Sequence, residues 1–193
     1  MGQREGYPYG TAVDHFSARP PPRMSQPRQL ITDLWIPREL GHQIAEEAKL
    51  FRDRWLETGG VLMGYTNCSS AVVTALVGPG PDASHKRNSF RPDTIYQRAE
   101  IAAHFERSSG LDTYLGDWHS HPTGGAGQSW TDRRMLARLT RDWTDGIDPH
   151  RPLMLIVAEN EWRCYCAKTE TPPRMLPSTA NFADVMLRLT EKN

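Results

Sequence analysis

The chain has 193 residues, which is long enough for one domain with a substantial hydrophobic core. Lysine plus arginine and aspartate plus glutamate number 23 each, so the net charge is zero, and we expect no nucleic-acid partner because polyanion binding needs a basic excess. No run of about eighteen apolar residues occurs and the N-terminus lacks the apolar segment of a signal peptide, so we expect a cytoplasmic protein without a membrane partner.

The first predicted elements follow a proline-rich segment. Residues 1–29 contain many prolines and few aliphatic side chains, which predicts a flexible tail. A short strand is expected at Leu34–Ile36, and Pro37 then suits the first position of a helix. Apolar residues at helical spacing predict that this helix runs over Pro37–Trp55 and buries one stripe, formed by Leu40, Ile44, Ala48, Phe51 and Trp55.

The middle of the chain alternates between strand and helix patterns. Val61–Tyr65 and Ala71–Val77 are predicted to pair as a hairpin, and residues 82–93 form a polar loop with a basic cluster at His85–Arg87. A helix is then expected from a capping residue, Asp93 or Thr94, to Ser108. Its buried face is predicted to comprise Ile95, Ala99, Ala102 and either Phe105 or Ala103.

The last part of the chain repeats this alternation. Thr113–His121 is predicted to be a strand, and a helix is expected to open at Ser129 or Thr131 and to run to residue 143. Leu153–Ala158 is an apolar run typical of a buried strand, and Trp162–Ala167 alternates as its hairpin partner would.

The three cysteines form no framework of the kind that disulfide-rich proteins show, which fits a reducing compartment. We expect Cys164 and Cys166 to pack as ordinary side chains of a strand rather than to serve a metal or redox role. After a linker at Thr171–Pro173, an amphipathic helix is expected to dock on the core, or else to bind a partner, through Phe182, Val185, Met186 and Leu189.

Helices and strands are thus mixed, with most strands in hairpins, which predicts an α+β or mixed α/β domain around one sheet. We divide the chain into a flexible tail at 1–29, a folded domain at 30–168, and a linker with a C-terminal amphipathic helix at 169–193.

One stretch, W-H-S-H-P-T-G-G-A-G-Q-S-W-T-D from Trp118 to Asp132, carries the chemistry. His119 and His121 are two residues apart, so in a strand both side chains point to the same face. The loop after them leads to Asp132, in the first turn of the next helix. Imidazole nitrogen and carboxylate oxygen are good zinc ligands, and three protein ligands plus a water form a catalytic zinc site. We therefore predict one Zn²⁺ per chain, bound by His119, His121 and Asp132.

A hydrolytic metal site also needs a base, and the best candidate is Glu57 in E-T-G-G-V-L-M-G-Y. The ordered set E…H-x-H-P…S-x-x-D resembles the JAMM (MPN-plus, or JAB) metalloprotease family. The segments L-E-T-G-G-V-L-M-G-Y, V-G-P-G-P and Y-L-G-D-W-H-S-H-P are most similar to its prokaryotic JAB branch. The resemblance covers roughly Ile31–Lys168.

This resemblance implies a single curved mixed sheet flanked by helices, a JAB/MPN-like fold with cytidine-deaminase-like layering. It also implies that Glu57 takes a proton from the attacking water and that the hydroxyl of Ser129 donates to the oxyanion. Two simpler interpretations remain open, because Glu57 could be a carboxylate that closes the first helix and Ser129 could only cap the next one. Asp117 shares a strand face with His119 and could orient a ligand imidazole.

Members of the family cleave isopeptide or peptide bonds after the C-terminal glycine of ubiquitin or a ubiquitin-like modifier. The resemblance to deconjugating peptidases of bacterial ubiquitin-like systems implies a modifier and its conjugates as partners, with conjugation-pathway enzymes, often in antiphage defence. The alternatives are a peptidase that processes a sulfur-carrier or other precursor, a non-catalytic MPN scaffold, and a RadC-like DNA-associated protein.

The substrate groove is expected beside the proposed base. An extended peptide could pair with the strand formed by Gly59, Gly60, Val61, Leu62 and Met63. The two glycines either form a turn or leave room for the substrate backbone. Residues 82–93 either help to hold the modifier, as the resemblance implies, or form a solvated loop.

Overall fold

The computed structural model describes residues 28–142, 150–175 and 177–190. The predicted tail therefore lies outside the described residues except at its end. There the Arg28 guanidinium donates to the Thr140 carbonyl at 2.8 Å, and Gln29 forms a β-bridge with His150, so contacts with the domain begin before residue 30. None of the helices in the described ranges is both long and apolar enough to cross a membrane.

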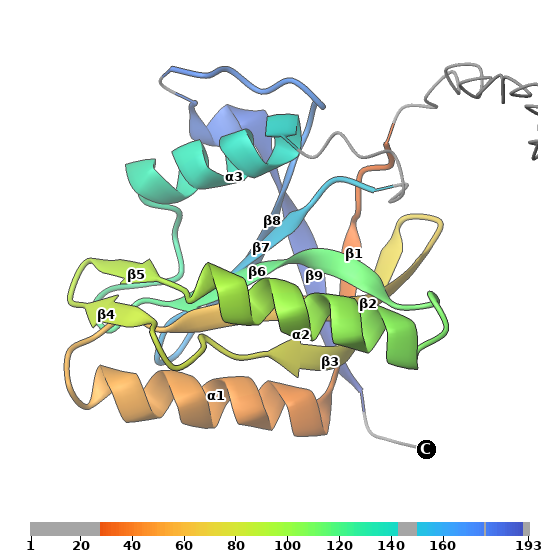
Figure 1. The fold of residues 1–193 in the computed structure, drawn as a ribbon. Coiled ribbons are helices and arrows are strands. Elements are labelled where there is room, and N and C mark those ends of the chain that lie inside the picture. Colours follow the sequence, from red (N-terminus) through yellow and green to blue (C-terminus); the bar gives the residue numbers. More distant parts are fainter. Residues whose placement is uncertain (1–27, 143–149, 176, 191–193) are drawn as a thin grey trace, which may run out of the picture.

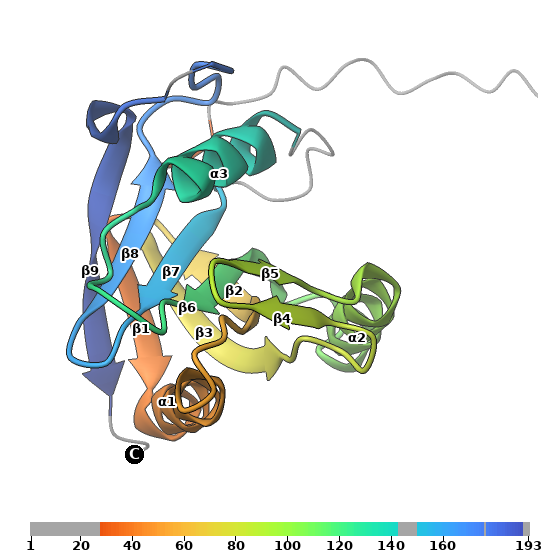
Figure 2. The same ribbon diagram turned by 90° about the vertical axis from the view of Figure 1, so that its left-hand side faces the viewer.

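A mixed sheet dominates the described part of the chain (Figures 1 and 2). Its strand order is β1-β3-β2-β6-β7-β8-β9, and it closes on itself because β1 pairs in parallel with both β3 and β9. The pair β6–β7 is also parallel, and the other neighbours are antiparallel. The strands are β1 (Asp33–Pro37), β2 (Gly59–Asn67), β3 (Ser70–Val77), β6 (Thr113–Ser120), β7 (Leu153–Val157), β8 (Trp162–Ala167) and β9 (Phe182–Thr190).

Helices cover this sheet from several sides, which confirms the predicted fold class. They are α1 (Arg38–Arg52), α2 (Thr94–Arg107) and α3 (Trp130–Asp142), with a short 3₁₀ turn, η1, at Thr179–Asn181. Helices α1 and α2 cover opposite faces of β2. Leu62 packs in the cluster that holds Ile44 of α1, whereas Val61 and Met63 pack with Ile101 of α2. Helix α3 contacts β8 at the other end of the domain (Figure 1).

The first predicted helix is confirmed as α1, although its end was predicted too late. Ile44 and Ala48 are buried as expected, together with Gly41. The helix ends at Arg52, and Trp55 adopts a left-handed backbone with φ of 60°. Its side chain is 59% exposed, so its predicted place in the buried stripe is wrong.

The second predicted helix is confirmed as α2, but its buried face was wrong. Asp93 caps it by accepting from the backbone N–H groups of Ile95 and Tyr96. The buried residue is Gln97, which donates to the carbonyl of Gly78 at 3.0 Å and thereby sets the rotation of the helix. The predicted residues Ile95, Ala99, Ala102 and Phe105 are exposed, while Ala103 is partly buried.

The segment 82–93 is not a plain loop. It contains a two-stranded hairpin of β4 (Ser84–Lys86) and β5 (Ser89–Arg91), which is separate from the main sheet. The ring of His85 stacks on Phe51 of α1 with 4.0 Å between centroids, so the hairpin is attached to the first helix.

The predicted C-terminal amphipathic helix is wrong, because Phe182–Thr190 forms the strand β9. Phe182 and Val185 are buried as expected, but Met186 and Leu189 are 57% and 55% exposed. Apolar residues at every third or fourth position are typical of a helix, whereas a half-buried strand would show them at every second position. Here the open edges of β1 and β8 supply backbone partners on both sides, which a helix could not use.

Candidate metal centre

The two histidines lie at the carboxyl end of β6. His119 is paired with Gly59 of β2 and Ile156 of β7, so its backbone is held on both sides. His121 follows the strand, and its N–H donates to the carbonyl of Val157 at 2.9 Å, which continues the ladder. Alternation along this extended segment aims both imidazoles at the same point.

Asp132 meets the two imidazoles from the first turn of α3. Nε2 of His119 lies 3.3 Å from Nε2 of His121 and 3.2 Å from Oδ1 of Asp132. Nε2 of His121 lies 3.5 Å from Oδ2 of Asp132. All three donor atoms lie within 4.8 Å of one another, and together they form a candidate metal site.

The chemistry of these donors fits zinc. Nδ1 of His121 lies 3.0 Å from the carbonyl oxygen of Gly125, and because a carbonyl can only accept, that nitrogen carries the hydrogen. In the neutral imidazole of His121 the lone pair is therefore on Nε2 and faces His119 and Asp132. Two imidazole nitrogens beside a carboxylate are the donor set of a catalytic zinc site, and a backbone carbonyl that fixes a ligand tautomer is typical of such sites.

Ser129 and Asp132 hold each other at the start of α3. The backbone N–H of Ser129 donates to Oδ2 of Asp132 at 2.6 Å, and the backbone N–H of Asp132 donates to Oγ of Ser129 at 3.2 Å. Ser129 thus caps the helix, as one of the two interpretations held. Burial raises the pKa of the Asp132 carboxyl. Hydrogen bonds with the two histidines and Ser129 have the larger, opposite effect, and they hold this pKa well below its ordinary value.

Glu57 lies just before β2, on the side of the two histidines. Its neighbour Thr58 donates its backbone N–H to Oγ of Ser120 at 3.0 Å, and the N–H of Ser120 donates to the Thr58 carbonyl at 2.7 Å. Burial raises the pKa of the half-buried Glu57 carboxyl, although the nearby charges of His119 and His121 oppose this. A carboxylate whose pKa is raised towards neutrality suits a base that later returns its proton.

The β4–β5 hairpin holds Glu57 from its other side. The N–H of Glu57 donates to the carbonyl of Lys86 at 2.8 Å, and Nδ1 of His85 donates to the carbonyl of Glu57 at 3.0 Å. The sequence marked His85 only as part of a basic cluster. Its contact with Glu57, like that of Gly125 with His121, depends on backbone positions for which no sequence pattern gives a signal.

The strand that was predicted to bind the substrate is closed to it. Val61, Leu62 and Met63 are at most 2% exposed and pair with β3 on one edge and β6 on the other. A peptide cannot add to a strand whose two edges are occupied, so this part of the predicted groove is wrong.

The two glycines before these residues serve the packing of the sheet. A Cβ on Gly59 would lie 2.3 Å from the carbonyl oxygen of Trp118, and a Cβ on Gly60 would lie 2.3 Å from that of Val77. Neither forms a turn, since both belong to β2. A side chain at either position would therefore meet the chain's own backbone, and the suggested contact of these glycines with a substrate stays a prediction.

The carboxylate of Asp117 accepts a hydrogen bond from a tyrosine hydroxyl rather than from an imidazole. The hydroxyl of Tyr114 donates to Oδ1 of Asp117 at 2.8 Å. Burial raises the pKa of the Asp117 carboxyl to about 6, while this bond and the charge of His119 lower it. Its suggested role as a support for a ligand imidazole stays a prediction. The neighbouring Trp118 is 3% exposed and belongs to the core, as expected.

Comparison with known proteins shows which family has this arrangement. A family model that describes prokaryotic homologs of the JAB domain matches residues 39–167. A probable metalloprotease of Sinorhizobium fredii is 39% identical over 126 residues, which are 64% of this chain and 74% of that protein.

Two further relatives are CD-NTase/cGAS isopeptidases. The Escherichia coli protein is 28% identical over 101 residues, and the Vibrio cholerae protein is 33% identical over 106 residues. The aligned part is 52% and 55% of this chain and 60% and 64% of those proteins, less than two thirds of their length. A solution structure of a Desulfitobacterium hafniense protein superposes with a TM-score of 0.54 at 15% identity, covering 82% of this chain and 94% of that one, which shows the shared fold.

Proposed function

The chain belongs to the prokaryotic JAB-domain family of metalloproteases, and we propose that it uses one zinc ion to cleave after the C-terminal glycine of a ubiquitin-like modifier. The observation that carries this proposal is the convergence of His119, His121 and Asp132 in front of Glu57. A non-catalytic scaffold of the MPN type needs no such set, so the geometry favours an enzyme.

The residues of the site divide the work of hydrolysis. A zinc ion bound by the three ligands would lower the pKa of a water and polarise a carbonyl. The carboxylate of Glu57 accepts a proton from the attacking water and returns it to the leaving amine. The hydroxyl of Ser129, whose oxygen is positioned by the N–H of Asp132, donates to the oxyanion, and one such donor typically contributes roughly 100- to 1000-fold in rate.

The modifier's tail needs a strand edge other than β2. The β4–β5 hairpin offers one beside Glu57. The carbonyl of Lys86 in β4 accepts a hydrogen bond from the N–H of Glu57, whereas β5 pairs only with β4 among the described residues. We place the extended tail along the outer edge of β5, where main-chain hydrogen bonds can lead it to the metal centre.

The names of two relatives favour an isopeptide bond over a linear one, since both are isopeptidases. A role in a bacterial antiphage conjugation system belongs to the same proposal, as does a cytoplasmic location. The described cysteines support a reducing compartment, because Cys68, Cys164 and Cys166 are all free thiols. Processing of a sulfur-carrier or other precursor is the second candidate, because such a substrate could present the same glycine end.

The test is cleavage of a ubiquitin-like protein joined through its terminal glycine to a lysine of a second protein. We expect mass spectrometry to show the intact modifier with a free C-terminus. Replacing the last glycine by leucine should lower kcat/KM by about a hundredfold, or ~2.7 kcal/mol of transition-state stabilisation, because a side chain would collide beside the metal. Equal cleavage of the glycine and leucine forms by the zinc-loaded protein would contradict the proposal and favour a general peptidase.

A further inference from the structure

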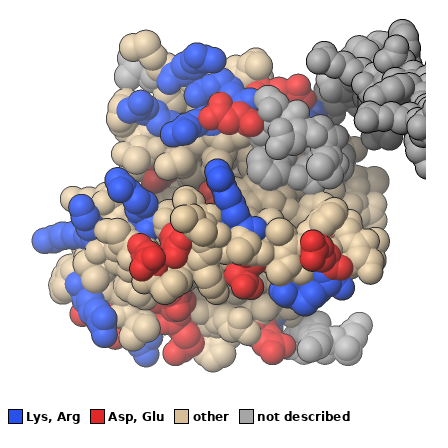
Figure 3. Space-filling view, viewed as in Figure 1, with Lys and Arg blue, Asp and Glu red and all other residues tan. Residues whose placement is uncertain are grey.

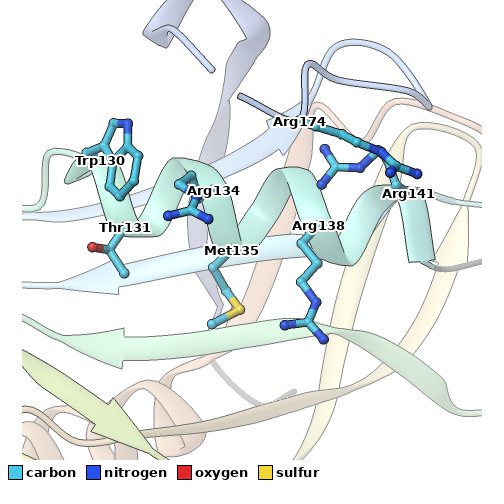
Figure 4. Close-up of a pocket in the computed structure, with 7 residues that line it drawn as sticks. All are labelled: Trp130, Thr131, Arg134, Met135, Arg138, Arg141 and Arg174. Atoms are coloured by element: carbon cyan, nitrogen blue, oxygen red, sulfur yellow. The ribbon is translucent and has the colours of Figure 1, made fainter. Parts of the chain in front are cut away.

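A groove of about 250 Å³ follows the outer face of α3 (Figure 4). Trp130 and Met135 contribute its apolar lining, and these side chains are 46% and 47% exposed. Three arginines project into it from successive turns of the helix, and a fourth comes from the segment after β8. They are Arg134, Arg138, Arg141 and Arg174.

The positive charge of this groove is largely uncompensated within the described residues. Arg138 is paired with Asp142 at 3.2 Å. Arg141 donates to the carbonyl of Pro172 at 3.0 Å, which leaves its charge in place. Arg134 lies over the ring of Trp130, 4.4 Å from its centroid. Figure 3 shows basic side chains gathered over this end of the molecule, although the whole chain has no net charge.

The groove starts at the N-terminal turn of α3, the same turn that carries the candidate ligand Asp132 on its buried side. Trp130 directly follows Ser129, and Thr131, which also lines the groove, directly precedes the ligand Asp132. Figures 1 and 2 show α3 above the carboxyl end of β6 and the β4–β5 hairpin beside that end. A substrate whose acyl side lies along the hairpin would therefore extend its leaving-group side onto α3.

We propose that the α3 groove binds an acidic segment of the target protein, next to the lysine whose amine is released, with an apolar side chain of that segment against Trp130 and Met135. The assignment to the leaving-group side rests on the proposed function. Guanidinium groups bind carboxylates with paired hydrogen bonds, and Trp and Met accept apolar side chains of varied shape. The zero net charge of the chain favours such a peptide over a nucleic acid.

Binding of a labelled peptide to the full chain tests this without any hydrolysis. Helix α3 has 13 residues and is about 20 Å long, which an extended peptide of about six residues spans. The probe is a fluorescein-labelled peptide with one leucine among glutamates, and its control carries glutamine in place of each glutamate. Fluorescence anisotropy at low salt should show binding of the acidic peptide at least tenfold tighter than that of the neutral one.

Charge reversal locates the binding site. Arg134→Glu and Arg138→Glu should each weaken binding of the acidic peptide by at least tenfold, whereas Arg98→Glu, at an exposed site on α2, should leave it unchanged. Equal binding of both peptides, an equal loss in Arg98→Glu, or displacement of the peptide by a short oligothymidine at a lower concentration would overturn the proposal. Because binding is measured, a chain that holds the acidic peptide but cleaves no glycine-linked modifier would support the groove and contradict only the proposed function.

Discussion

At the scale of single residues, the candidate metal ligands are held in a different way from the candidate base. His119, His121 and Asp132 contact one another through their donor atoms. Glu57 is positioned instead by backbone hydrogen bonds, its own with Lys86 of the hairpin and those between the adjacent Thr58 and Ser120. The charges of the candidate ligands affect the pKa of its carboxyl. Replacing the Glu57 side chain should therefore slow hydrolysis without lowering the zinc content.

We predict that Glu57→Gln keeps about one zinc per chain and its melting temperature but lowers kcat by at least about a hundredfold, the usual contribution of a general base. Asp132→Asn, the matched control, should lose most of the zinc because an amide is a poor ligand. Elemental analysis of both purified variants and kinetics with the glycine-linked substrate measure this. Loss of zinc from Glu57→Gln, or unchanged turnover, would show that Glu57 is not the base.

At the scale of elements, the site depends on how closely β2 approaches β6. The Cα of Gly59 faces the backbone of Trp118 and His119, and a Cβ there would lie 2.3 Å from the Trp118 carbonyl oxygen and 3.0 Å from the Cα of His119. A backbone contact cannot relax as a flexible side chain can. Packing at this glycine therefore affects the position of the candidate ligand His119.

Gly59→Ala should lower the free energy of unfolding by about 1–3 kcal/mol and weaken zinc binding, because β2 and β6 must move apart. Gly78→Ala is the control, since a Cβ at Gly78 meets no atom within 4 Å. Chemical denaturation and competition with a zinc chelator give the two quantities. If the two variants were equally stable and bound zinc equally well, close packing at Gly59 would not explain its place in the site.

At the scale of the whole molecule, β9 closes the sheet and joins the two ends of the domain. It pairs with β1, near the start of the described chain, and with β8. The guanidinium of Arg188 donates to Asp33 across this junction at 2.8 Å and lowers the pKa of that carboxyl. Because β1 leads directly into α1, closure also anchors the helix that precedes Glu57.

If β9 closes the sheet as a strand, substitutions at two adjacent residues should differ strongly in their effect on stability. Val185 is 5% exposed and Met186 is 57% exposed, as alternation in a strand requires. Val185→Gln should cost about 2 kcal/mol or more, since it buries an amide without a partner. Met186→Gln should stay within about 0.5 kcal/mol. Thermal unfolding of the two variants decides the point, and similar losses for both would indicate that this segment packs as a helix.

The sequence alone indicated the three candidate metal ligands, which the structure brings together, as well as the candidate base, the family and most element positions. Local rules suffice for the three candidate ligands, because H-x-H in a strand and a carboxylate in a first helical turn have one geometry each. The base and the family came from the resemblance of the ordered motifs. The burial of β2, the face of α2 and the strand β9 were decided by the tertiary structure. Whether a strand edge is open depends on which strands lie beside it. The buried face of α2 depends on a hydrogen bond from Gln97 to the distant carbonyl of Gly78. The β9 segment is extended because it pairs with the edges of β1 and β8.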